Sequence, residues 1–554
     1  MLAGRGVALD DAPKFLNPTL RDMLPDPSRL RDMDKAVERL VRAINSGEKI
    51  AVFGDYDVDG ASATALLARF FAAIGREVLV YIPDRRLEGY GPNAEAMRKL
   101  RAAGAAVVIT VDCGTTAFAA LEAAAEAGLD AIIIDHHMGE ARLPPAFAIV
   151  NPNRLDETGE LGALAAVGVA FLLLVALNRA LRSAHWYGEG HEAPDLMRFL
   201  DLVALGTVCD VVPLTGANRA LVAQGLKVMA QRGNAGLAAL ADVAGLSERP
   251  DCYHAGFVFG PRVNASGRLG DCGLGARLLA TDDAAEARAL ALRLDRYNEE
   301  RRAVEAAVLD AALAEAERQV AAGANVIVCA GEGWHPGVVG IVAGRLRERF
   351  DRPALVVGLE NGIGRGSGRS VPGVALGAAV IAAHQSGILI NGGGHAMAAG
   401  FTVRQDRIAD LRTFIEERVL KDVGGALPVP SLRLDGALTP EGASRDLCEL
   451  LERIAPFGPG NPRPRFGFSA ARVAWAEPVG SDHVRCRLAA ANGGTPLTGI
   501  AFRAAGTELG RAILEARGGA LHIAGYLRAD NWQGRASAQL VIEDVAPVAA
   551  QAAC

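Results

Sequence analysis

The sequence has few cysteines, and none of them form a Cys-x-x-Cys pair. Eight cysteines are scattered over 554 residues. Zinc ribbons and dithiol redox centres need closely spaced thiols, so both kinds of site are disfavoured and reduced cytoplasmic thiols are the simpler interpretation. The N-terminal residues also lack the apolar core of a secretory signal. We therefore expect a cytoplasmic protein.

The sequence also lacks an excess of positive charge, with 58 Lys and Arg against 64 Asp and Glu and a net charge of -6. Any nucleic-acid-binding surface must therefore be local. Residues 161–177 contain no charged or hydrogen-bonding side chain. This run is short for a membrane span and rich in Ala and Gly, so we expect a helix packed inside a large domain and no membrane association.

The length of the chain exceeds what one hydrophobic core normally supports, which predicts three or four domains. Changes in pattern suggest where these units begin and end. We expect an N-terminal arm and helix over 1–45, an α/β catalytic domain over 46–215, a helical connector over 216–322, a second α/β domain over 323–430, and a nucleic-acid-binding domain over 431–554.

Short β-branched runs alternate with Ala-rich helical runs in the first α/β domain. Continuous apolar strands separated by helices indicate a parallel sheet that is covered on both faces and doubly wound. The expected strands lie near 49–54, 77–83, 106–112, 131–137, 147–152 and, less clearly, 202–210.

The connector is expected to be mostly helical, with a loop at 259–273. Residues 282–322 contain no Gly or Pro and predict one long helix between two lobes, with a coiled-coil dimer as the alternative. The second α/β unit carries two Gly-rich segments, 361–370 and 391–400, which we expect to be loops. Beyond residue 430, five strand-like runs fit a small barrel of the oligonucleotide-binding (OB) type, and a β-sandwich fits nearly as well.

Four acidic patches follow the expected strands. They are Asp55, Asp57 and Asp59; Asp112; Asp135-His136-His137; and Asp210. One Asp after a strand is commonly a helix cap, but four such ends, one with two adjacent histidines, exceed what capping explains. Ligands of open parallel sheets bind at the carboxyl ends of strands. Carboxylate and imidazole groups suit divalent cations, and a cation would relieve the repulsion between converging acids.

These patches predict a manganese- or magnesium-dependent phosphoesterase. Two metal ions can hold a phosphate and lower the pKa of a bridging water. Asp112, alone on a central strand, is the candidate for the bridging carboxylate. The chain shows no serine elbow, no local Cys-His pair and no Walker loop, which favours a metal-activated water as the nucleophile.

The ordered motifs resemble the RecJ family of exonucleases within the DHH phosphoesterase superfamily. They include GDYDVDG, VDCGTT, IIIDHH, GTVCDVVPL, GPRVNASGRL, GWHPGVVGIVAGRL, GSGRS, NGGGHAMAAG and FGPGNP, and they extend over nearly the whole chain. The resemblance implies a single-strand-specific 5′-to-3′ DNA exonuclease that releases 5′-mononucleotides in DNA repair and recombination. It further implies two Mn²⁺ or Mg²⁺ ions, a monomer, and single-strand-binding protein and a RecQ-type helicase as partners.

The resemblance also implies roles for the acidic residues. Metal ligation is expected of Asp57, Asp59, Asp112, His136 and Asp210. At the catalytic centre, Asp55 and Asp135 are expected to orient these ligands or contact metal-bound water. His137 is expected to donate to the phosphate, with direct ligation as the alternative. Related pyrophosphatases carry a metal-binding His at the position of Phe53, so the first metal site is expected to be more open or weaker here.

A strand end must also be recognised, and the Gly-rich segments carry side chains suited to phosphate: Arg365, Ser367, Arg369 and His395. The other matched motifs add Arg85, Tyr90, Arg262, Asn264 and Arg268 as candidates for the same channel. Flexible surface loops and ordinary ion pairs are the alternatives for these residues. The barrel is expected to grip the strand by charge and stacking, although its aromatic residues could equally form its core. An enzyme for small phosphate substrates and an inactive binding scaffold are the rival interpretations.

Overall fold

The N-terminal arm and its helix lead into the first domain of the computed structural model, which describes residues 1–85, 87–188, 192–489, 496–530 and 537–548. The arm consists of short helical turns, η1 Ala3–Arg5, α1 Ala12–Leu16, α2 Leu20–Met23 and η2 Pro27–Arg29. The helix α3, Met33–Ser46, buries one apolar face and ends at Gly47. Gly47 has a φ of 69°, the left-handed conformation that glycine adopts at a helix end.

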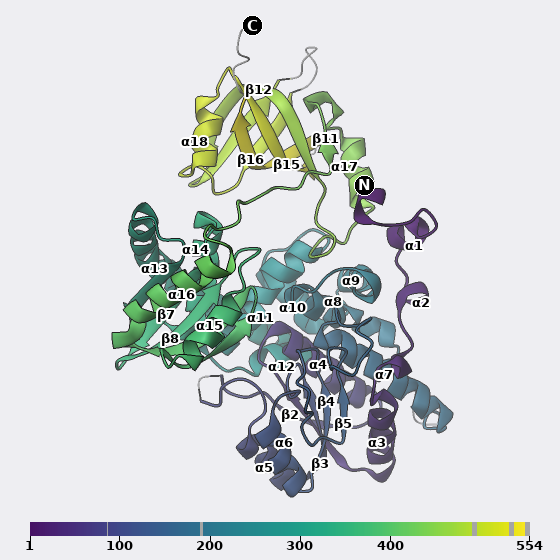
Figure 1. The fold of residues 1–554 in the computed structure, drawn as a ribbon. Helices are drawn as coiled ribbons and strands as arrows, with labels where there is room; N and C mark the ends of the chain where they lie inside the picture. Colours follow the sequence, from purple (N-terminus) through teal and green to yellow (C-terminus); the bar gives the residue numbers. More distant parts are fainter. Residues whose placement is uncertain (86, 189–191, 490–495, 531–536, 549–554) are drawn as a thin grey trace.

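The catalytic domain is built on a parallel sheet of order β2-β1-β3-β4-β5 (Figure 1). Its strands are β1 Lys49–Gly54, β2 Val78–Tyr81, β3 Ala105–Val111, β4 Asp130–Ile134 and β5 Ala148–Val150. The chain turns in opposite directions from β1 to β2 and from β1 to β3, so the doubly wound sheet has its switch point between β1 and β3. Open sheets of this kind bind ligands at that crevice.

Helices cover both faces of this sheet. One face carries α3 with α4 Val58–Ala73, α7 Ala166–Ser183 and α8 Leu200–Cys209, and the other carries α5 Ala94–Ala102 and α6 Phe118–Glu126. The 3-10 turn η3, Leu196–Phe199, leads into α8. By length and composition α7 could cross a membrane, but 72% of it is buried inside this domain. The expected core helix is therefore confirmed.

The strand expected at 202–210 is wrong, because these residues form α8 and Asp210 follows a helix. The run is apolar on every side because α8 is packed against α4, α7 and α9. A short, wholly buried helix shows no amphipathic period, so its sequence cannot be told from that of a buried strand.

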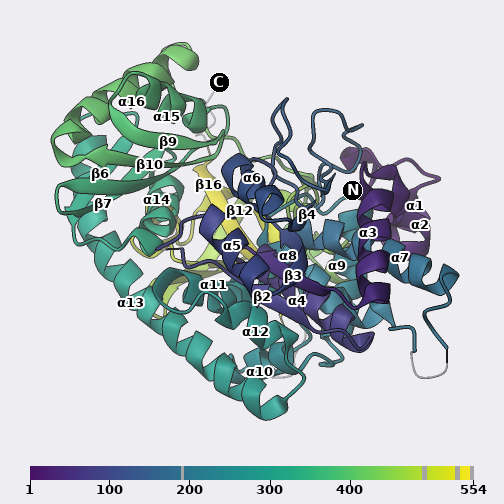
Figure 2. The ribbon, with the colours of Figure 1, turned by 90° about the horizontal axis from the view of Figure 1, so that it is seen from below.

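The connector is helical throughout most of its length. It contains α9 Gly216–Met229, α10 Ala235–Val243, a π-helical turn η4 His254–Phe259, α11 Gly260–Leu269, α12 Leu274–Ala280 and α13 Ala284–Ala321. The single long helix α13 is confirmed, and it runs along α10, α11 and α14 to join the two lobes (Figure 2).

The loop expected at 259–273 is also wrong, because most of it is α11. Its glycines serve close packing. A Cβ at Gly267 would lie 3.2 Å from the Tyr56 backbone, and one at Gly270 would lie 2.5 Å from the Tyr297 ring on α13. Tertiary contacts therefore override the low helix propensity of these residues.

The second α/β domain has a mixed sheet of order β6-β7-β8-β10-β9. Its elements are β6 Ile327–Glu332, α14 Pro336–Phe350, β7 Ala354–Glu360, β8 Ile363–Arg369, α15 Leu376–Gln385, β9 Leu389–His395, β10 Ala398–Arg404, η5 Gln405–Arg407 and α16 Ile408–Asp422. The Gly-rich segments, expected as loops, are strands. Alternate glycines leave room for neighbouring side chains, since a Cβ at Gly366 would lie 2.2 Å from Phe401 on the paired strand β10 and one at Gly368 2.7 Å from Leu376 on α15.

The C-terminal domain is a closed barrel, with β12 paired to both β13 and β15. Its elements are β11 Gly436–Ala437, η6 Pro440–Gly442, α17 Arg445–Glu452, β12 Arg465–Val479, β13 His483–Leu488, β14 Leu497–Ala501, α18 Glu508–Glu515, β15 Ala520–Asp530 and β16 Ser537–Pro547. The OB-type barrel is confirmed over the sandwich. Phe466 and Phe468 are core residues, Phe502 is 43% exposed, and Trp532 lies outside the described residues.

Candidate metal centre and phosphate-binding cleft

Three of the four acidic patches follow neighbouring strands at the switch point of the first sheet. Asp55 follows β1, Asp112 follows β3, and Asp135 follows β4. Asp57 caps α4 by accepting a hydrogen bond from the Gly60 amide at 3.0 Å. A Cβ at Gly60 would lie 2.6 Å from the Asp55 carbonyl oxygen, so only glycine permits this tight turn.

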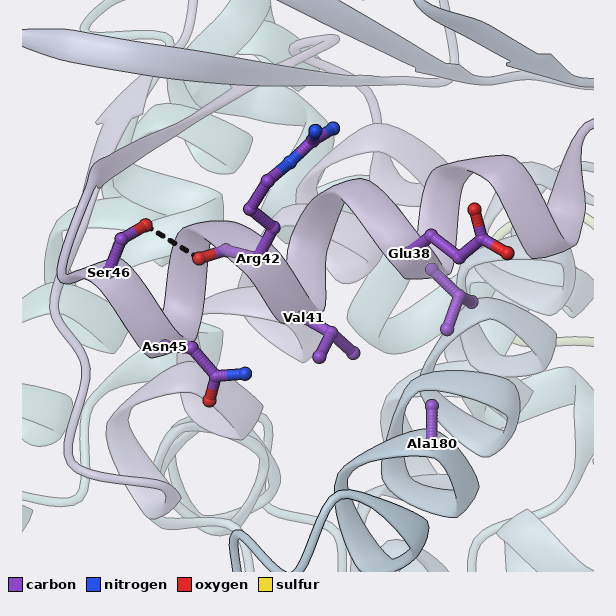
Figure 3. Close-up of a pocket in the computed structure, with 7 residues that line it drawn as sticks. Glu38, Val41, Arg42, Asn45, Ser46 and Ala180 are labelled. Carbon is purple, nitrogen blue, oxygen red and sulfur yellow. Dashed lines mark hydrogen bonds between the residues drawn. The ribbon is translucent and has the colours of Figure 1, made fainter.

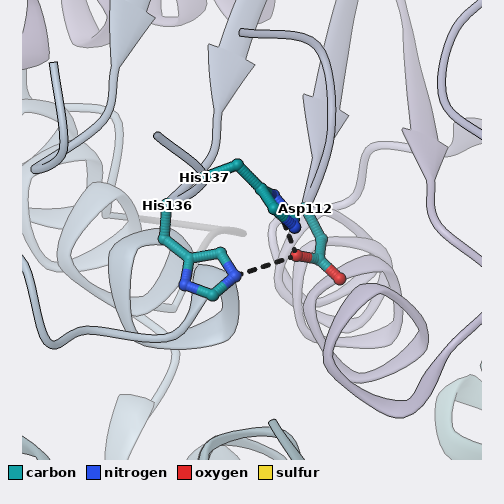
Figure 4. Close-up of side chains that lie close together, drawn as sticks. All are labelled: Asp112, His136 and His137. Atoms are coloured by element: carbon teal, nitrogen blue, oxygen red, sulfur yellow. Dashed lines mark ion pairs between the residues drawn. The ribbon is translucent and has the colours of Figure 1, made fainter. Parts of the chain in front are cut away.

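The ligand atoms of these patches converge around two residues, Asp112 and His136. The Nε2 atom of His136 lies 3.3 Å from Asp112 Oδ1, and its Nδ1 lies 3.6 Å from Asp210 Oδ2. Figure 4 shows Asp112 between the rings of His136 and His137, whose Nδ1 is 3.9 Å away. Three groups of side chains could each hold an ion: Asp112, His136 and His137; Asp59, His136 and Asp210; and Asp55, Asp57 and Asp112.

Backbone amides hold two of the carboxylates in place. The buried carboxylate of Asp59 accepts hydrogen bonds from Ala166 and Val167 at 2.7 and 2.9 Å, at the start of α7. Asp135 accepts from the Thr115 amide at 3.0 Å and lies 2.8 Å from His137 Nδ1. Asp135 therefore uses its oxygens to orient the loop and the His137 ring.

Burial and crowding raise the pKa values of several of these acids. Burial, with the charge of Asp57, raises the pKa of Asp55 to about 8 and that of Asp210 to about 7. Burial and the neighbouring carboxylates also raise the pKa of Asp112 well above its ordinary range. Converging acids of this kind hold protons unless a cation neutralises them.

The pKa values of the two histidines shift in opposite directions in these surroundings. Burial and the charge of His137 lower the pKa of His136, which favours the neutral imidazole that binds metals. Burial is the largest influence on His137 and opposes its charge, but the hydrogen bond to Asp135 and the charges of Asp135, Asp210 and Asp57 together outweigh it and raise the pKa of His137 to about 9. At Asp135 the hydrogen bond and charge of His137, with the hydrogen bonds from Thr115, together outweigh burial and lower its pKa.

The donor set fits divalent cations. Three buried atoms aimed at the cluster make no hydrogen bond within the described part of the chain: Asp55 Oδ1, His136 Nε2 and Asp210 Oδ2. Buried polar atoms normally have partners, so orphaned oxygen and nitrogen atoms at one point indicate a place for an ion. Oxygen ligands with one imidazole suit Mn²⁺ and Mg²⁺.

Backbone strain is concentrated at the same centre. Asp112 has a φ of 61° and Val211, directly after Asp210, has a φ of 62°. A β-branched residue rarely adopts this conformation, and such strain is typical of functional sites. Gly206 on α8 admits Asp59, since a Cβ there would lie 2.9 Å from its Oδ1.

Arginines from three regions of the chain gather near the acids, and the charge of Arg85 among them acts on Asp55. Arg268 of α11 donates to the Gly337 carbonyl oxygen at 2.6 Å, at the start of α14. Burial lowers the pKa of Arg268 to about 10, and the charges of Arg85, Arg301 and Arg369 contribute to this shift. Burial also lowers the pKa of Arg369, with contributions from Arg347 and Arg85. Mutual repulsion among these cations favours a bound anion.

Ser367 and Arg369 lie on the face of β8 opposite its alternate glycines. Arg369 Nη1 donates to Ser367 Oγ at 3.0 Å, and a Cβ at Gly340 of α14 would lie 3.0 Å from that Oγ. The strand period of two explains the GRGSGR pattern, in which glycines pack on one face and the candidate phosphate-binding side chains point to the other.

The other predicted binding residues lie in different surroundings. Arg262 is paired with Asp295 at 2.9 Å, as the ion-pair alternative predicted. Tyr90 lies at the metal centre, where its hydroxyl donates to the Asp112 carbonyl oxygen at 3.1 Å. Asn264 is half-buried on α11, and Arg365 and His395 are exposed on the second sheet.

Sequence reasoning missed Asn151, which follows β5 and donates to the His137 carbonyl oxygen at 2.8 Å. The rule that located the acids, polar side chains at carboxyl ends of strands, would have found it. It also missed Tyr253 and Phe257, which are 61% and 67% exposed at η4 with their rings stacked 5.3 Å apart. These rings line a groove of about 800 Å³ that extends from Val211 to Tyr526 on the barrel.

A separate hollow of about 630 Å³ lies between α3 and α7 (Figure 3). Its lining includes Glu38, Arg42, Asn45 and Ser46, and the Ser46 hydroxyl donates to the Arg42 carbonyl oxygen at 2.6 Å. None of its lining residues belongs to the acidic patches or to the arginine cluster.

Comparison with known proteins finds a matching domain family for each α/β domain and for the barrel. Residues 49–207 match the DHH family N-terminal domain, residues 323–421 the DHHA1 domain, and residues 434–544 the RecJ OB domain. The chain is 35% identical to the single-stranded-DNA-specific exonuclease RecJ of Escherichia coli, over 99% of this chain and 95% of that one. It is 33% identical to the Haemophilus influenzae protein of the same name, over 97% and 94%.

A solved structure has the same architecture. RecJ of Thermus thermophilus in complex with Mn²⁺ matches with a TM-score of 0.82 at 31% identity, covering 99% of this chain and 75% of that one. The structure of that protein with Mg²⁺ matches with a TM-score of 0.75. On the evidence of its three domains, its near full-length relatives and its fold, the chain belongs to the RecJ family of DHH phosphoesterases.

Proposed function

We propose that the protein is a single-stranded-DNA-specific exonuclease that removes 5′-mononucleotides in the 5′-to-3′ direction, in DNA repair and recombination. The observation that carries the proposal is the proximity of two sites, an acidic centre suited to two Mn²⁺ or Mg²⁺ ions and a cluster of arginines suited to phosphate, in which the charge of Arg85 acts on Asp55. A strand bound across both would present its terminal phosphodiester to the acidic centre.

Asp57, Asp59, Asp112, His136 and Asp210 would hold the ions. Asp112 and His136 each belong to two of the candidate groups, which suits Asp112 for the bridging position. When bound, the ions would supply a water of lowered pKa and stabilise negative charge on the phosphate oxygens. Asp55 contributes an unpaired oxygen beside them.

His137 would bind the phosphate of the substrate. Its Nδ1 is engaged with Asp135, which fixes the ring and leaves Nε2 to donate a hydrogen bond. The Tyr90 hydroxyl lies 3.4 Å from this ring, so Tyr90 would steady His137 and Asp112 together.

The 5′ end of the strand would bind at Arg85, Arg268 and Arg369, with Ser367. Among the described residues, none of these three arginines lies within ion-pair distance of a carboxylate, so their donors are available for a phosphate. Arg262, Asn264, Arg365 and His395 would contribute along the rest of the channel. A guanidinium fork binds phosphate oxygens two at a time, which favours capture of a terminal phosphate.

The unpaired bases would follow the groove from the barrel to the metal centre. Stacked exposed rings at Tyr253 and Phe257 offer a platform for bases, and Arg465 and Tyr526 lie at the barrel end of the groove. Base stacking on aromatic rings does not depend on sequence, and it requires bases that are unpaired. This supports the preference for single strands.

The same proposal covers the organisation and setting of the protein. Residues 46–215 would be the unit of catalysis, residues 323–430 the unit of end capture and residues 431–554 the unit of strand binding. The protein would act as a monomer in the cytoplasm. Single-strand-binding protein and a RecQ-type helicase, which expose or deliver unpaired strands, would be its partners.

Digestion of end-labelled DNA tests the proposal. With Mn²⁺ or Mg²⁺, mononucleotides should appear from the 5′ end of a single strand, and blunt duplex should stay intact. Degradation from the 3′ end, internal cutting or equal attack on duplex would refute it. Inorganic pyrophosphate and a dinucleotide serve as small substrates, and exclusive cleavage of these would favour the rival enzyme class.

A further inference from the structure

A tight loop of the C-terminal domain, residues 454–462 between α17 and β12, packs against the catalytic side of the molecule and is called here the linker knot. The Asn461 side chain closes it by donating to the carbonyl oxygens of Ile454 and Pro456 at 2.8 and 2.7 Å. The Leu214 amide donates to the Pro459 carbonyl oxygen at 2.7 Å. The knot therefore rests on a segment that begins only a few residues after Asp210.

A buried arginine, Arg219 of α9, holds three segments of the chain together. Its Nε donates to the Phe15 carbonyl oxygen at 3.0 Å, in the N-terminal arm. Its Nη2 donates to the carbonyl oxygens of Ile454 and Ala455 at 3.0 and 2.7 Å, in the linker knot. The guanidinium also lies 3.8 Å from the Phe15 ring centroid.

The setting of this arginine is unusual. Arg219 is 1% exposed, and among the described residues no carboxylate lies within ion-pair distance of it. Burial and nearby Arg5 lower its pKa to about 10, which leaves it charged at neutral pH. A buried charge without a counterion is costly, so the carbonyl oxygens and the aromatic ring must stabilise it. Separation of any of the three segments would leave the charge of Arg219 without some of the groups that stabilise it.

The N-terminal arm closes over the knot from the other side. Arg5 donates to the Asn461 side chain and, at 2.6 Å, to the Pro462 carbonyl oxygen. Arg433, just before the barrel, donates to the Gly4 carbonyl oxygen at 3.3 Å. Figure 1 shows this arm beginning beside α17 of the barrel and descending through α1 and α2 to the catalytic domain.

The knot also forms one wall of the groove that connects the barrel to the metal centre. Pro456 and Phe457 line the groove together with Tyr253 and Phe257, and Val211 lies in it beside Asp210. A displacement of the knot would therefore change the width of the groove and the place at which a strand leaving the barrel arrives.

We propose that Arg219 is a positioning residue that fixes the barrel over the catalytic domain, so that a strand bound by the barrel is aligned with the metal centre. The inference rests on the proposed function and adds to it a residue that touches neither substrate nor ion. Only a guanidinium offers enough donors in a rigid fork to bind carbonyl oxygens from two segments at once, so lysine should be a poor substitute.

The test compares Arg219→Lys and Arg219→Met with the wild-type full-length chain on two substrates with Mn²⁺. One is a 5′-phosphorylated trinucleotide, which reaches the metal centre alone. The other is a strand of roughly 30 nucleotides, longer than the ~4–16 nucleotides that one OB domain covers. Arg277→Met is the matched control, because Arg277 is an exposed arginine of the same half of the chain, paired with Glu286.

Both Arg219 variants should raise KM for the long strand by about tenfold or more, with kcat and trinucleotide cleavage unchanged; tenfold is the scale of losing one stacked base. The Arg277 variant should match the wild type. Equal loss on both substrates, or no loss on either, would overturn the positioning role. If the Arg219 variants do not fold, Arg5→Ala and Asn461→Ala decide, since they loosen the knot from its outer side and should give the same split. A wild type that cleaves neither substrate would refute the proposed function itself.

Discussion

The two α/β domains share a layered architecture but carry candidate functional groups of opposite charge. In the catalytic domain, all the strands are parallel, and the acids stand at their carboxyl ends around Asp112 and His136. In the second domain the sheet is mixed, and the phosphate-binding candidates Ser367 and Arg369 stand on the face of an antiparallel strand. The difference shows that a sheet can position functional groups at the ends of its strands or on one of its faces, and that each placement leaves a different trace in the sequence.

Burial also shifts the pKa values of the acids and of the arginines in opposite directions. Burial and mutual repulsion raise the pKa values of Asp55, Asp112 and Asp210, so the centre needs cations. On the other side, burial and neighbouring cations lower the pKa values of Arg268 and Arg369, and the cluster needs an anion. Metal ions and phosphate are complementary to each other, which is why we propose that the acids and the arginines act as one site.

The largest expected effect is at the acidic face, the group of candidate metal ligands around Asp112 and His136. Asp112→Asn keeps the shape of the side chain and removes its charge, so hydrolysis of single-stranded DNA should fall on the order of 10³-fold or more, as about 4 kcal/mol of lost transition-state stabilisation would produce. Binding of the strand should be largely retained. Asp282→Asn, at an exposed acid paired with Arg69, is the matched control. Substantial activity in the Asp112 variant would remove it from the bridging position.

Metal binding should stabilise the acidic face more at high pH. Mn²⁺ at about 100 times its dissociation constant should raise the free energy of unfolding by about 2.7 kcal/mol. Because Asp55 and Asp210 have pKa values raised to about 8 and about 7, the protons that they hold near pH 6 compete with the ion. Thermal melts should therefore show a larger Mn²⁺ shift at about pH 8 than at about pH 6. An equal shift at both pH values, or in Asp112→Asn, would place the ion elsewhere.

The arginine face should govern how the strand end is recognised. Arg369→Ala should raise KM for a 5′-phosphorylated strand by roughly 10- to 100-fold, the effect of one charge-assisted hydrogen bond, and leave a 5′-hydroxyl strand nearly unchanged. Arg369→Lys should be intermediate because it keeps the charge and loses the fork. Arg404→Ala, on the neighbouring strand and paired with Asp406, is the control. If KM rises equally for 5′-phosphorylated and 5′-hydroxyl strands, Arg369 binds the DNA backbone and does not recognise the terminal phosphate.

The smallest expected effect concerns an acid of the catalytic domain that has no metal role. Asp201 on α8 is 2% exposed, and burial raises its pKa to about 6. The unfolded chain loses this proton near pH 4, so wild-type stability should fall as pH rises from about 4 to about 6. Asp201→Asn should remove that fall and stabilise the protein at neutral pH by about 1 kcal/mol, with about 3 kcal/mol as the upper limit.

Urea denaturation at about pH 4 and about pH 8 measures the Asp201 effect. The variant should be more stable than the wild type only at the higher pH. Mn²⁺ should raise the free energy of unfolding of both proteins equally. A gain of the same size at both pH values would mean that burial does not hold a proton on Asp201. A loss of the Mn²⁺ shift would mean that this acid belongs to the metal centre after all.

Much of the fold could be predicted because its signals are local. Uninterrupted β-branched runs between helices predicted the parallel sheet, the absence of Gly and Pro predicted α13, and evenly spaced strands predicted the barrel. The Gly-rich segments misled because glycine was taken to mean flexibility. At Gly366 and Gly368 it provides room for Phe401 of the paired strand and Leu376 of α15, and that need depends on how these elements pack.

The sequence by itself determined which chemical groups gather at the carboxyl ends of β1, β3 and β4, because strand direction and register follow from local hydrophobic patterns. Only the tertiary structure brought Asp210 to them from the end of a helix, and set the arginines of α11 and β8 against each other. It also gave Arg219 its role, since carbonyl oxygens from residues 15 and 454 carry no signature in any sequence. Contacts between remote segments depend on packing, and packing is decided by the whole chain.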